Sequence, residues 1–193
     1  MAINDKAVFK PGVAHFYTNP EVGAALPADL RNPTDGWVHM GHTSLEDIIE
    51  ASSDGGDLTI LGSLQKRNLR SSRAPLTEGF TVNLLQLDED SLKFYAGANV
   101  EVNSKDGRLL GVPESPEPTI AAWYVVITDG TMDAGLYTDK AEFMRADDFA
   151  VSDTESLMQL PVTVTPLGTG KNPYSWIKPH EYKGETPAIV PGG

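Results

Sequence analysis

Histidines are the side chains in this sequence best suited to metal binding or acid–base chemistry. The chain has four of them, His15, His39, His42 and His180, and it has no cysteine. His39 and His42 are three residues apart, a spacing that suits a helix, whereas the residues around His39 favour a strand. No third ligand with a characteristic spacing accompanies them. We therefore expect structural histidines rather than a metal site.

Two other patterns match ligand-binding motifs only in part. The segment Gly168-Thr-Gly170-Lys171 lacks the spacing and the following helix of a phosphate-binding loop. The acidic pairs and runs at 88–90 and 147–148 lack the EF-hand pattern and are better explained by a helix start and a solvated loop. Carboxylate pairs for glycoside hydrolysis stay open, but nothing in the sequence selects one. We predict no catalytic residue, no cofactor-binding residue, no metal ligand and no cofactor.

The aromatic and basic side chains allow two further functional interpretations. Trp37, Trp123 and Trp176 could stack on sugars, although core or interface anchors are the commoner use of tryptophan. The segment Leu64–Arg73 carries Lys66, Arg67, Arg70 and Arg73 without an acid. Nucleic-acid binding is disfavoured here, because aromatic residues do not alternate with the basic ones and the whole chain has a formal net charge of −12. A basic strand face or a complementary subunit contact explains the run better.

The stretch Thr119–Leu167 predicts the sheet on which the other elements are arranged. Ile120–Ile127 is a short apolar run, either a buried strand or a short core helix, and its β-branched and aromatic content favours the strand. The pair Asp129-Gly130 predicts a two-residue hairpin in which both turn positions have positive φ, with a return strand over Thr131–Thr138. In Leu160–Leu167, Val162 and Val164 alternate with threonines, as in a half-buried strand.

Shorter elements are predicted elsewhere in the chain. Asp88 is a suitable N-cap and Gly97 a suitable left-handed C′ residue for one short helix. Residues 42–50 predict one helical turn, followed by a strand at Ile48–Ala51. Further strands are expected at 12–18, 37–41, 57–62, 64–73 and 80–87, and a loop with a hairpin around residues 105–107 at 100–118.

Composition predicts one mainly β domain with an arm at each end. We expect an N-terminal arm with one strand at 1–35, a sandwich domain at 36–167 and a Pro/Gly-rich C-terminal arm at 168–193 that lacks apolar periodicity and is ordered only by a partner. The chain of 193 residues has a 40% apolar fraction, which is sufficient for a core. The absence of cysteine excludes disulfides and favours folding in the cytosol, and we expect neither a secretory signal nor a membrane span.

The order of these features resembles the major tail (tail tube) proteins of long-tailed, non-contractile phages, especially those of actinobacterial hosts. Each motif is loose alone, and their order and spacing carry the resemblance. The matching segments are Val13–Phe16 with Gly23–Pro27, Trp37–Thr43, Phe80–Leu87 with Leu92–Gly97, and Phe143–Ala146 with Leu160–Leu167. Together they span most of residues 12–167, whereas the segment between Gly97 and Thr119 and the tail beyond Leu167 match no pattern of the family.

The resemblance implies a β-sandwich with one short flanking helix and extended N- and C-terminal arms, and no enzymatic activity. It also implies that copies of the chain form hexameric rings that stack into a tail tube in the virion, after assembly in the host cytoplasm. Partners would be the chain itself and the tail tip, tape measure and terminator proteins. Viral DNA would pass through the lumen without specific binding.

Two alternative functions follow from the residues alone. A β-sandwich binding or decoration module for carbohydrate or a receptor should be monomeric or trimeric and expose an aromatic platform. A small hydrolase needs acids or histidines that converge on one pocket.

Overall fold

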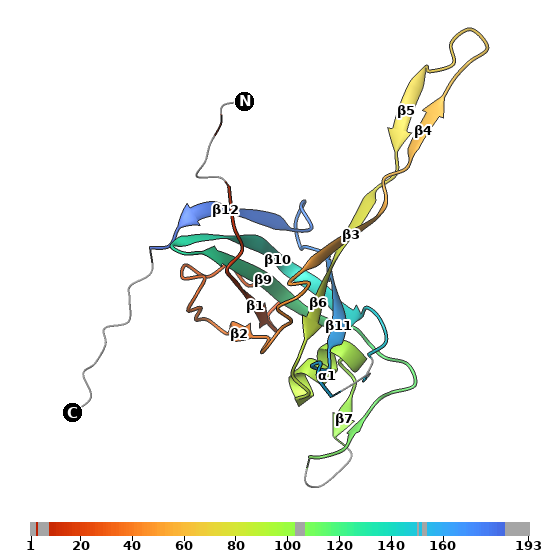
Figure 1. Ribbon diagram of the computed structural model, residues 1–193. Coiled ribbons are helices and arrows are strands. Elements are labelled where there is room, and N and C mark those ends of the chain that lie inside the picture. Colours follow the sequence, from red (N-terminus) through yellow and green to blue (C-terminus); the bar gives the residue numbers. More distant parts are fainter. Residues whose placement is uncertain (1–2, 4–7, 103–106, 150, 152–153, 184–193) are drawn as a thin grey trace. The chain divides into compact units, whose positions relative to one another are not determined.

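A computed structural model describes residue 3 and residues 8–102, 107–149, 151 and 154–183, and β-strands are its main element (Figure 1). The chain folds as two compact units. Unit 1 comprises Met1–His42, Thr119–Glu142 and Leu167–Gly193, and unit 2 comprises Thr43–Pro118 and Phe143–Pro166. Mainly antiparallel strands with one short helix confirm the predicted fold class and are consistent with a β-sandwich. Within the described residues, the helix is too short to cross a membrane.

Unit 1 contains an antiparallel sheet built from strands far apart in the sequence. Its strand order is β2-β1-β9-β10, and β12 also pairs with β10. The strands are β1 (Val13–Asn19), β2 (Val38–His39), β9 (Thr119–Asp129), β10 (Met132–Arg145, which continues into unit 2) and β12 (Ser175–Glu181).

Strand β9 confirms the prediction of a buried strand over Ile120–Ile127. Residues 121–126 are all buried, because β9 lies between β1 and β10. The turn differs by one residue from the prediction: β9 includes Asp129, the turn is Gly130-Thr131, and within it only Gly130 has positive φ. Farther along β10, a Cβ on Gly135 would lie 1.8 Å from the carbonyl oxygen of Val125. Only glycine therefore fits where these two strands are closest.

An irregular segment, residues 20–36, covers one face of the unit 1 sheet. Aromatic side chains beneath it donate hydrogen bonds to its carbonyl oxygens. The donors are Tyr17 to Arg31 (3.0 Å), Tyr124 to Leu30 (3.1 Å), Tyr137 to Ala24 (2.6 Å) and the indole of Trp37 to Ala25 (3.2 Å). Burial raises the pKa of all three tyrosines, so their hydroxyls remain protonated donors.

Arg31 links the same segment to β10 through an ion pair and hydrogen bonds. Its guanidinium contacts the carboxylate of Asp133 at 2.7 Å, and this carboxylate has no exposed surface. The guanidinium also donates to the carbonyl oxygen of Gly130 and stacks on the ring of Tyr182, whose hydroxyl donates to Asp29. The hydrogen bonds to Asp133 raise the pKa of Arg31, so the guanidinium stays charged. A single arginine thus connects the segment, β10 and the chain just after β12.

The opposite face of the unit 1 sheet contains two large, fully buried aromatic side chains. Phe16 and Trp123 stack with ring centroids 6.4 Å apart, and neither has exposed surface. Trp123 is therefore a core residue, as is Trp37 on the other face, whereas Trp176 on β12 is 71% exposed.

Unit 2 contains a second group of antiparallel strands and the helix. Its main strand order is β11-β6-β3. The elements are β3 (Glu50–Gly55), β4 (Leu58–Leu61), β5 (Arg70–Arg73), β6 (Leu76–Leu84), α1 (Glu89–Ala96), β7 (Glu101–Val102), β8 (Leu110–Gly111) and β11 (Leu160–Pro166).

The core of unit 2 follows the predicted alternation in β11. Leu160, Val162 and Val164 lie opposite residues of β6 that are equally buried, namely Leu84, Val82 and Phe80. The helix begins as predicted, because the Asp88 carboxylate accepts from the main-chain N–H of Ser91 at 2.9 Å. Gly97 has φ 114° and ψ 152°, so φ is positive but the residue is not left-handed helical. The pairing of β7 with β8 confirms the predicted hairpin. Residues 103–106 of its connection lie outside the described residues, and Gly107 has positive φ.

The predicted helical turn in residues 42–50 is wrong. Thr43 instead forms an isolated β-bridge with Leu84, and Asp47 has φ 50°, which a right-handed helix does not allow. The following strand begins at Glu50 rather than at Ile48.

The expectation that the chain forms no regular element of its own after Leu167 was also wrong. Residues Ser175–Glu181 form β12, and Ile177 packs on the cluster of Tyr17, Trp37 and Tyr124. Pro179 is accommodated because the register with β10 shifts between Asp133 and Gly135, and proline is tolerated at such irregularities on edge strands.

Replacing Trp123 with alanine should destabilise the protein by roughly 3–5 kcal/mol, since a large buried aromatic side chain is lost from a core. Urea unfolding of the purified chain measures the change. Trp176→Ala is the matched control and should have little effect, because Trp176 is mostly exposed. Equal effects of the two substitutions would contradict the assignment of Trp123 to the core.

Replacing Arg31 with alanine should destabilise the protein by about 3 kcal/mol, because the Asp133 carboxylate would remain buried without its partner. Arg145→Ala is the control: its ion pair with Asp148, at 3.6 Å, is exposed, and its loss should cost less than about 1 kcal/mol. Chemical unfolding at pH 7 compares the two variants, and a smaller loss for Arg31→Ala than for Arg145→Ala would exclude the proposed role of the buried pair.

Candidate assembly surfaces

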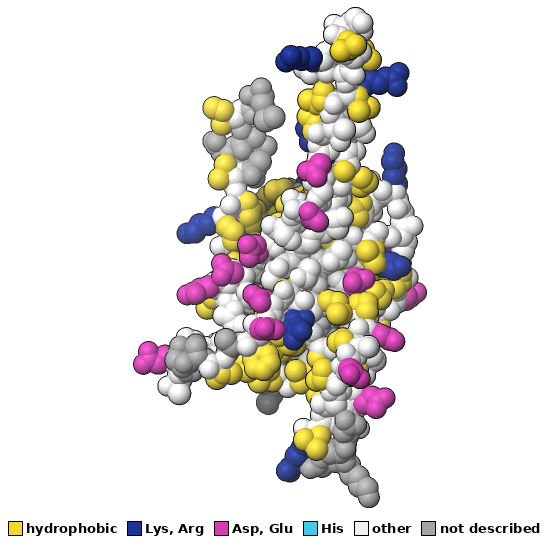
Figure 2. Space-filling view, turned by 90° about the vertical axis from the view of Figure 1, so that its right-hand side faces the viewer, with side chains coloured by type: hydrophobic (Ala, Val, Ile, Leu, Met, Phe, Trp, Pro, Cys, Tyr) yellow, Lys and Arg dark blue, Asp and Glu magenta, His cyan; other side chains and the backbone are white. Residues whose placement is uncertain are grey.

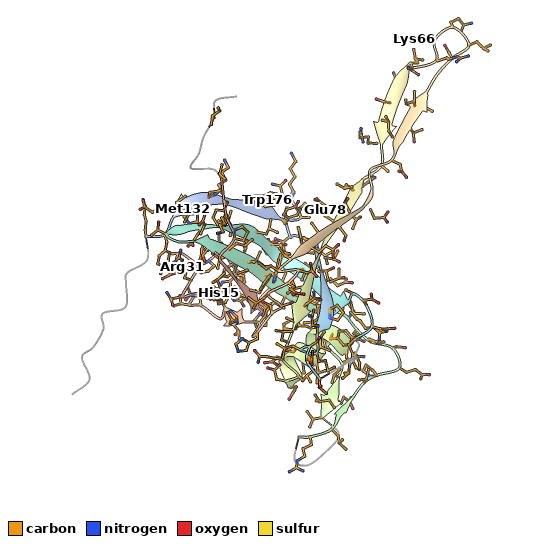
Figure 3. All side chains as sticks on the ribbon, viewed as in Figure 1. His15, Arg31, Lys66, Glu78, Met132 and Trp176 are labelled. Carbon is orange, nitrogen blue, oxygen red and sulfur yellow. The ribbon has the colours of Figure 1, made fainter. Side chains whose placement is uncertain are left out.

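A long β-hairpin, residues 50–79, extends from unit 2, and we call it the arm. Strands β3 and β6 form its base, and β4 and β5 form its outer part, beyond which lies the loop that contains Lys66 (Figures 1 and 3). Apart from Gly56, every residue from Glu50 to Thr77 is exposed. An isolated two-stranded ribbon is at best marginally stable in water, so the arm requires another surface to be held firmly.

Both faces of the outer arm combine apolar and basic side chains. Leu58 lies opposite Arg73 on one face, and Leu61 lies opposite Arg70 on the other. Leu64 and Leu69, near the tip, are exposed as well. Figure 2 shows hydrophobic and basic side chains together on this part of the molecule. Exposed apolar surface of this kind marks interaction sites.

Unit 2 also has an acidic hollow of about 540 Å³. Four carboxylates line it, together with polar side chains such as Thr81, Asn83 and Gln159; the acids are Asp47, Glu50, Asp147 and Asp148. The charge of this surface is thus opposite to that of the arm tip. Its four acids are exposed, and the hollow is open to solvent.

The histidines that the sequence offered for chemistry form one pair. His15 on β1 and His39 on β2 are hydrogen-bonded, and His42 lies close enough to affect the charge state of His39. His180 is on β12. Among the described residues, no group of three histidines or acids could hold a metal ion.

The other partial motifs have structural positions. Gly168–Lys171 lies in the connection between β11 and β12, so a strand rather than a helix follows it. Asp88 caps α1, and Asp147 and Asp148 line the acidic hollow. Asp133, one of many acids in the segment 129–155, is buried against Arg31 and is not available at the surface.

Sequence reasoning missed the arm as one element. The sequence predicted separate short strands, each with one buried face, because alternating apolar and polar residues are typical of such strands. In the arm, both faces are exposed. The usable signal was the absence of acids from residues 58–73, which contain all four basic residues of the outer arm.

Comparison with known proteins gives consistent matches over the whole chain. Residues 1–188 match the phage tail tube protein family. The major tail protein Gp23 of Mycobacterium phage D29 is 34% identical over 207 aligned positions, covering 100% of this chain and 99% of that protein. The major tail protein Gp23 of Mycobacterium phage L5 is 35% identical over 192 positions, covering 92% of this chain and 93% of that protein.

Proposed function

The chain belongs to the phage tail tube protein family, and from this premise we propose how its copies join into a tube. It is a structural protein of the virion tail that self-assembles into the tail tube, and it is not an enzyme. We propose that its copies form stacked rings, six to a ring, in the host cytoplasm, and that neighbouring copies are linked by the arm.

The exposure of the arm on both faces is the observation that carries this proposal. An arm with exposed leucines and arginines on each side gains stability only when a neighbour covers it. A second copy of the chain is the partner available throughout a homopolymer. Contacts between different patches that close by rotation form rings.

Charge complementarity supports an acidic partner surface for the arm tip. The outer arm carries Lys66 and Arg67 at its tip and Arg70 and Arg73 on β5. The hollow of unit 2 carries four carboxylates, two of which, Asp147 and Asp148, belong to the acidic segment 129–155. We propose that the tip of one copy meets these acids on another copy. Such pairing guides association and fixes the register more than it increases affinity.

The outermost strands provide a second means of joining copies. β2 in unit 1 and β3 in unit 2 each end a strand order and leave main-chain groups for pairing. Joining such edges between subunits would cover them. Tail tip, tape measure and terminator proteins are the further partners that we propose for the ends and lumen of such a tube.

The net charge supports a conduit that does not retain DNA. A basic wall would bind phosphates and release counterions, whereas the formal net charge of −12 leaves acids to face the lumen. We therefore place surface acids along the DNA path and the arm arginines at contacts between copies. Asp133 is not among the lumen acids, because it pairs with Arg31.

Reversing the charge of the arm with Arg70→Glu and Arg73→Glu should stop tube growth and leave the subunit folded, since both side chains are exposed. Negative-stain microscopy and size-exclusion chromatography measure assembly, and circular dichroism measures folding. Growth of the parent should also slow as salt rises from about 0.05 to 0.5 M, because screening weakens the attraction.

The matched control is the double substitution Arg70→Lys and Arg73→Lys, which keeps the charge and should still assemble. Normal tubes from the glutamate variant would overturn the role of the arm. A parent protein that stays monomeric or trimeric under all salt conditions would instead favour the alternative of a binding or decoration module.

A further inference from the structure

The histidine pair of unit 1 joins the outermost strand of its sheet to the next strand. His15 Nδ1 and His39 Nε2 are 3.1 Å apart, and the two rings meet edge to face (His15 is labelled in Figure 3). Strand β2 has two residues, which lie opposite Thr18 and Tyr17 of β1. The side-chain hydrogen bond therefore adds a contact to a ladder of only two residue pairs, which the buried Trp37 and Met40 flank.

The hydrogen-bond partners define which ring nitrogens carry hydrogen. The main-chain N–H of Gly41 donates to His39 Nδ1 at 2.9 Å, so Nδ1 carries no hydrogen. The neutral ring of His39 then carries its hydrogen on Nε2 and donates it to His15 Nδ1. Both acceptor nitrogens are therefore occupied, and the arrangement requires two neutral rings.

A proton added to either ring removes one of these hydrogen bonds. On His15 it would occupy Nδ1 and face the N–H of His39, and on His39 it would occupy Nδ1 and face the N–H of Gly41. In each case two donors would face one another. With one ring protonated, the His15–His39 bond can persist at the cost of the Gly41 bond. With both rings protonated, both facing nitrogens carry hydrogen, so the pair must separate.

We propose that the His15–His39 pair is a pH-sensitive contact that holds β2 on β1 at neutral pH and releases it in mildly acidic solution. The device acts within a single copy of the chain, so it does not depend on how copies assemble.

The groups around the pair do not compensate an added positive charge. Positive charge on His15 or His42 would repel a positive charge on His39. The ring of His39 lies against the ring of Tyr17, with centroids 5.0 Å apart. On β9, Val126 and Tyr124 lie opposite His15 and Tyr17. From the covering segment, Asp29 acts on Tyr17, and the carbonyl oxygen of Arg31 accepts the Tyr17 hydroxyl.

The direction of the pKa shift agrees with this geometry. Partial burial of the ring and the neighbouring His15 and His42 lower the pKa of His39, although part of the residue is exposed. A histidine whose pKa is lowered by folding binds its proton more readily in the unfolded state. Its contribution to stability is therefore present above the ordinary histidine pKa of about 6.5 and is lost as pH falls below that value.

Hydrogen exchange of the full-length subunit, measured by NMR at pH 7.5 and pH 5.5 and corrected for intrinsic rates, tests the proposal. The amides of Val38 and Met40, which face β1, should lose protection roughly fivefold at pH 5.5, the factor that corresponds to a hydrogen bond of about 1 kcal/mol. The amide of Val125 in β9 is the internal reference and should keep its protection. The ring signals of His39 should change over the same pH range as the loss.

The double substitution His15→Asn and His39→Gln provides a side-chain acceptor and a donor that do not titrate. This variant should show the same β2 protection at both pH values, whereas His180→Asn should retain the behaviour of the parent. Unchanged β2 protection in the parent would overturn the proposal, and so would a loss that persists in the double variant. Should the double variant fail to fold, the parent alone decides, because its β2 amides and histidine rings are measured in one titration.

Discussion

The packing of residues 20–36 on the unit 1 sheet depends on hydrogen bonds from aromatic side chains to main-chain carbonyl groups. An irregular segment that covers a core has few main-chain donors of its own for its carbonyl groups. Each buried carbonyl left without a donor would destabilise the fold by about 1–3 kcal/mol. Tyr17, Tyr124, Tyr137 and Trp37 meet this need from four different places in the chain. The same side chains provide apolar rings to the core. One set of residues therefore satisfies both the polar and the apolar requirements of this face.

The arm presents the opposite situation. Its main-chain groups are hydrogen-bonded between strands, yet its side chains are exposed and do not pack in a core of the chain. The covered segment completes its interactions inside unit 1, whereas the side chains of the arm stay exposed and, in our proposal, contact a neighbouring copy. This division suits a tail tube protein, because a subunit must be folded before it assembles and must still carry unsatisfied surface.

The sequence correctly predicted the elements whose structure depends mainly on residues close together in the chain. The apolar run at Ile120–Ile127, the alternation around Val162 and the cap at Asp88 each specify their own structure. The order of residues 20–36 could not be predicted in the same way, because two of its four donors, Tyr124 and Tyr137, come from β9 and β10, about a hundred residues later. Strand β12 was missed because it is held by the main chain of β10 rather than by a pattern of its own. The histidine pair was visible as residue types, but the contact of His15 with His39 depends on the register of β1 and β2.

The pairing of β1 with β9 sets an order of events during synthesis. The contact between Thr128 and the carbonyl of Val13 spans 115 residues, whereas β4 and β5 are joined by a short loop. Local hairpins close quickly and distant strands pair slowly. As the chain leaves the ribosome, the arm can form while Phe16 and Tyr17 still wait for β9. Until more than half of the protein has been made, the N-terminal strand has only the two-residue β2 as a partner. In this interval its apolar side chains expose the nascent chain to aggregation.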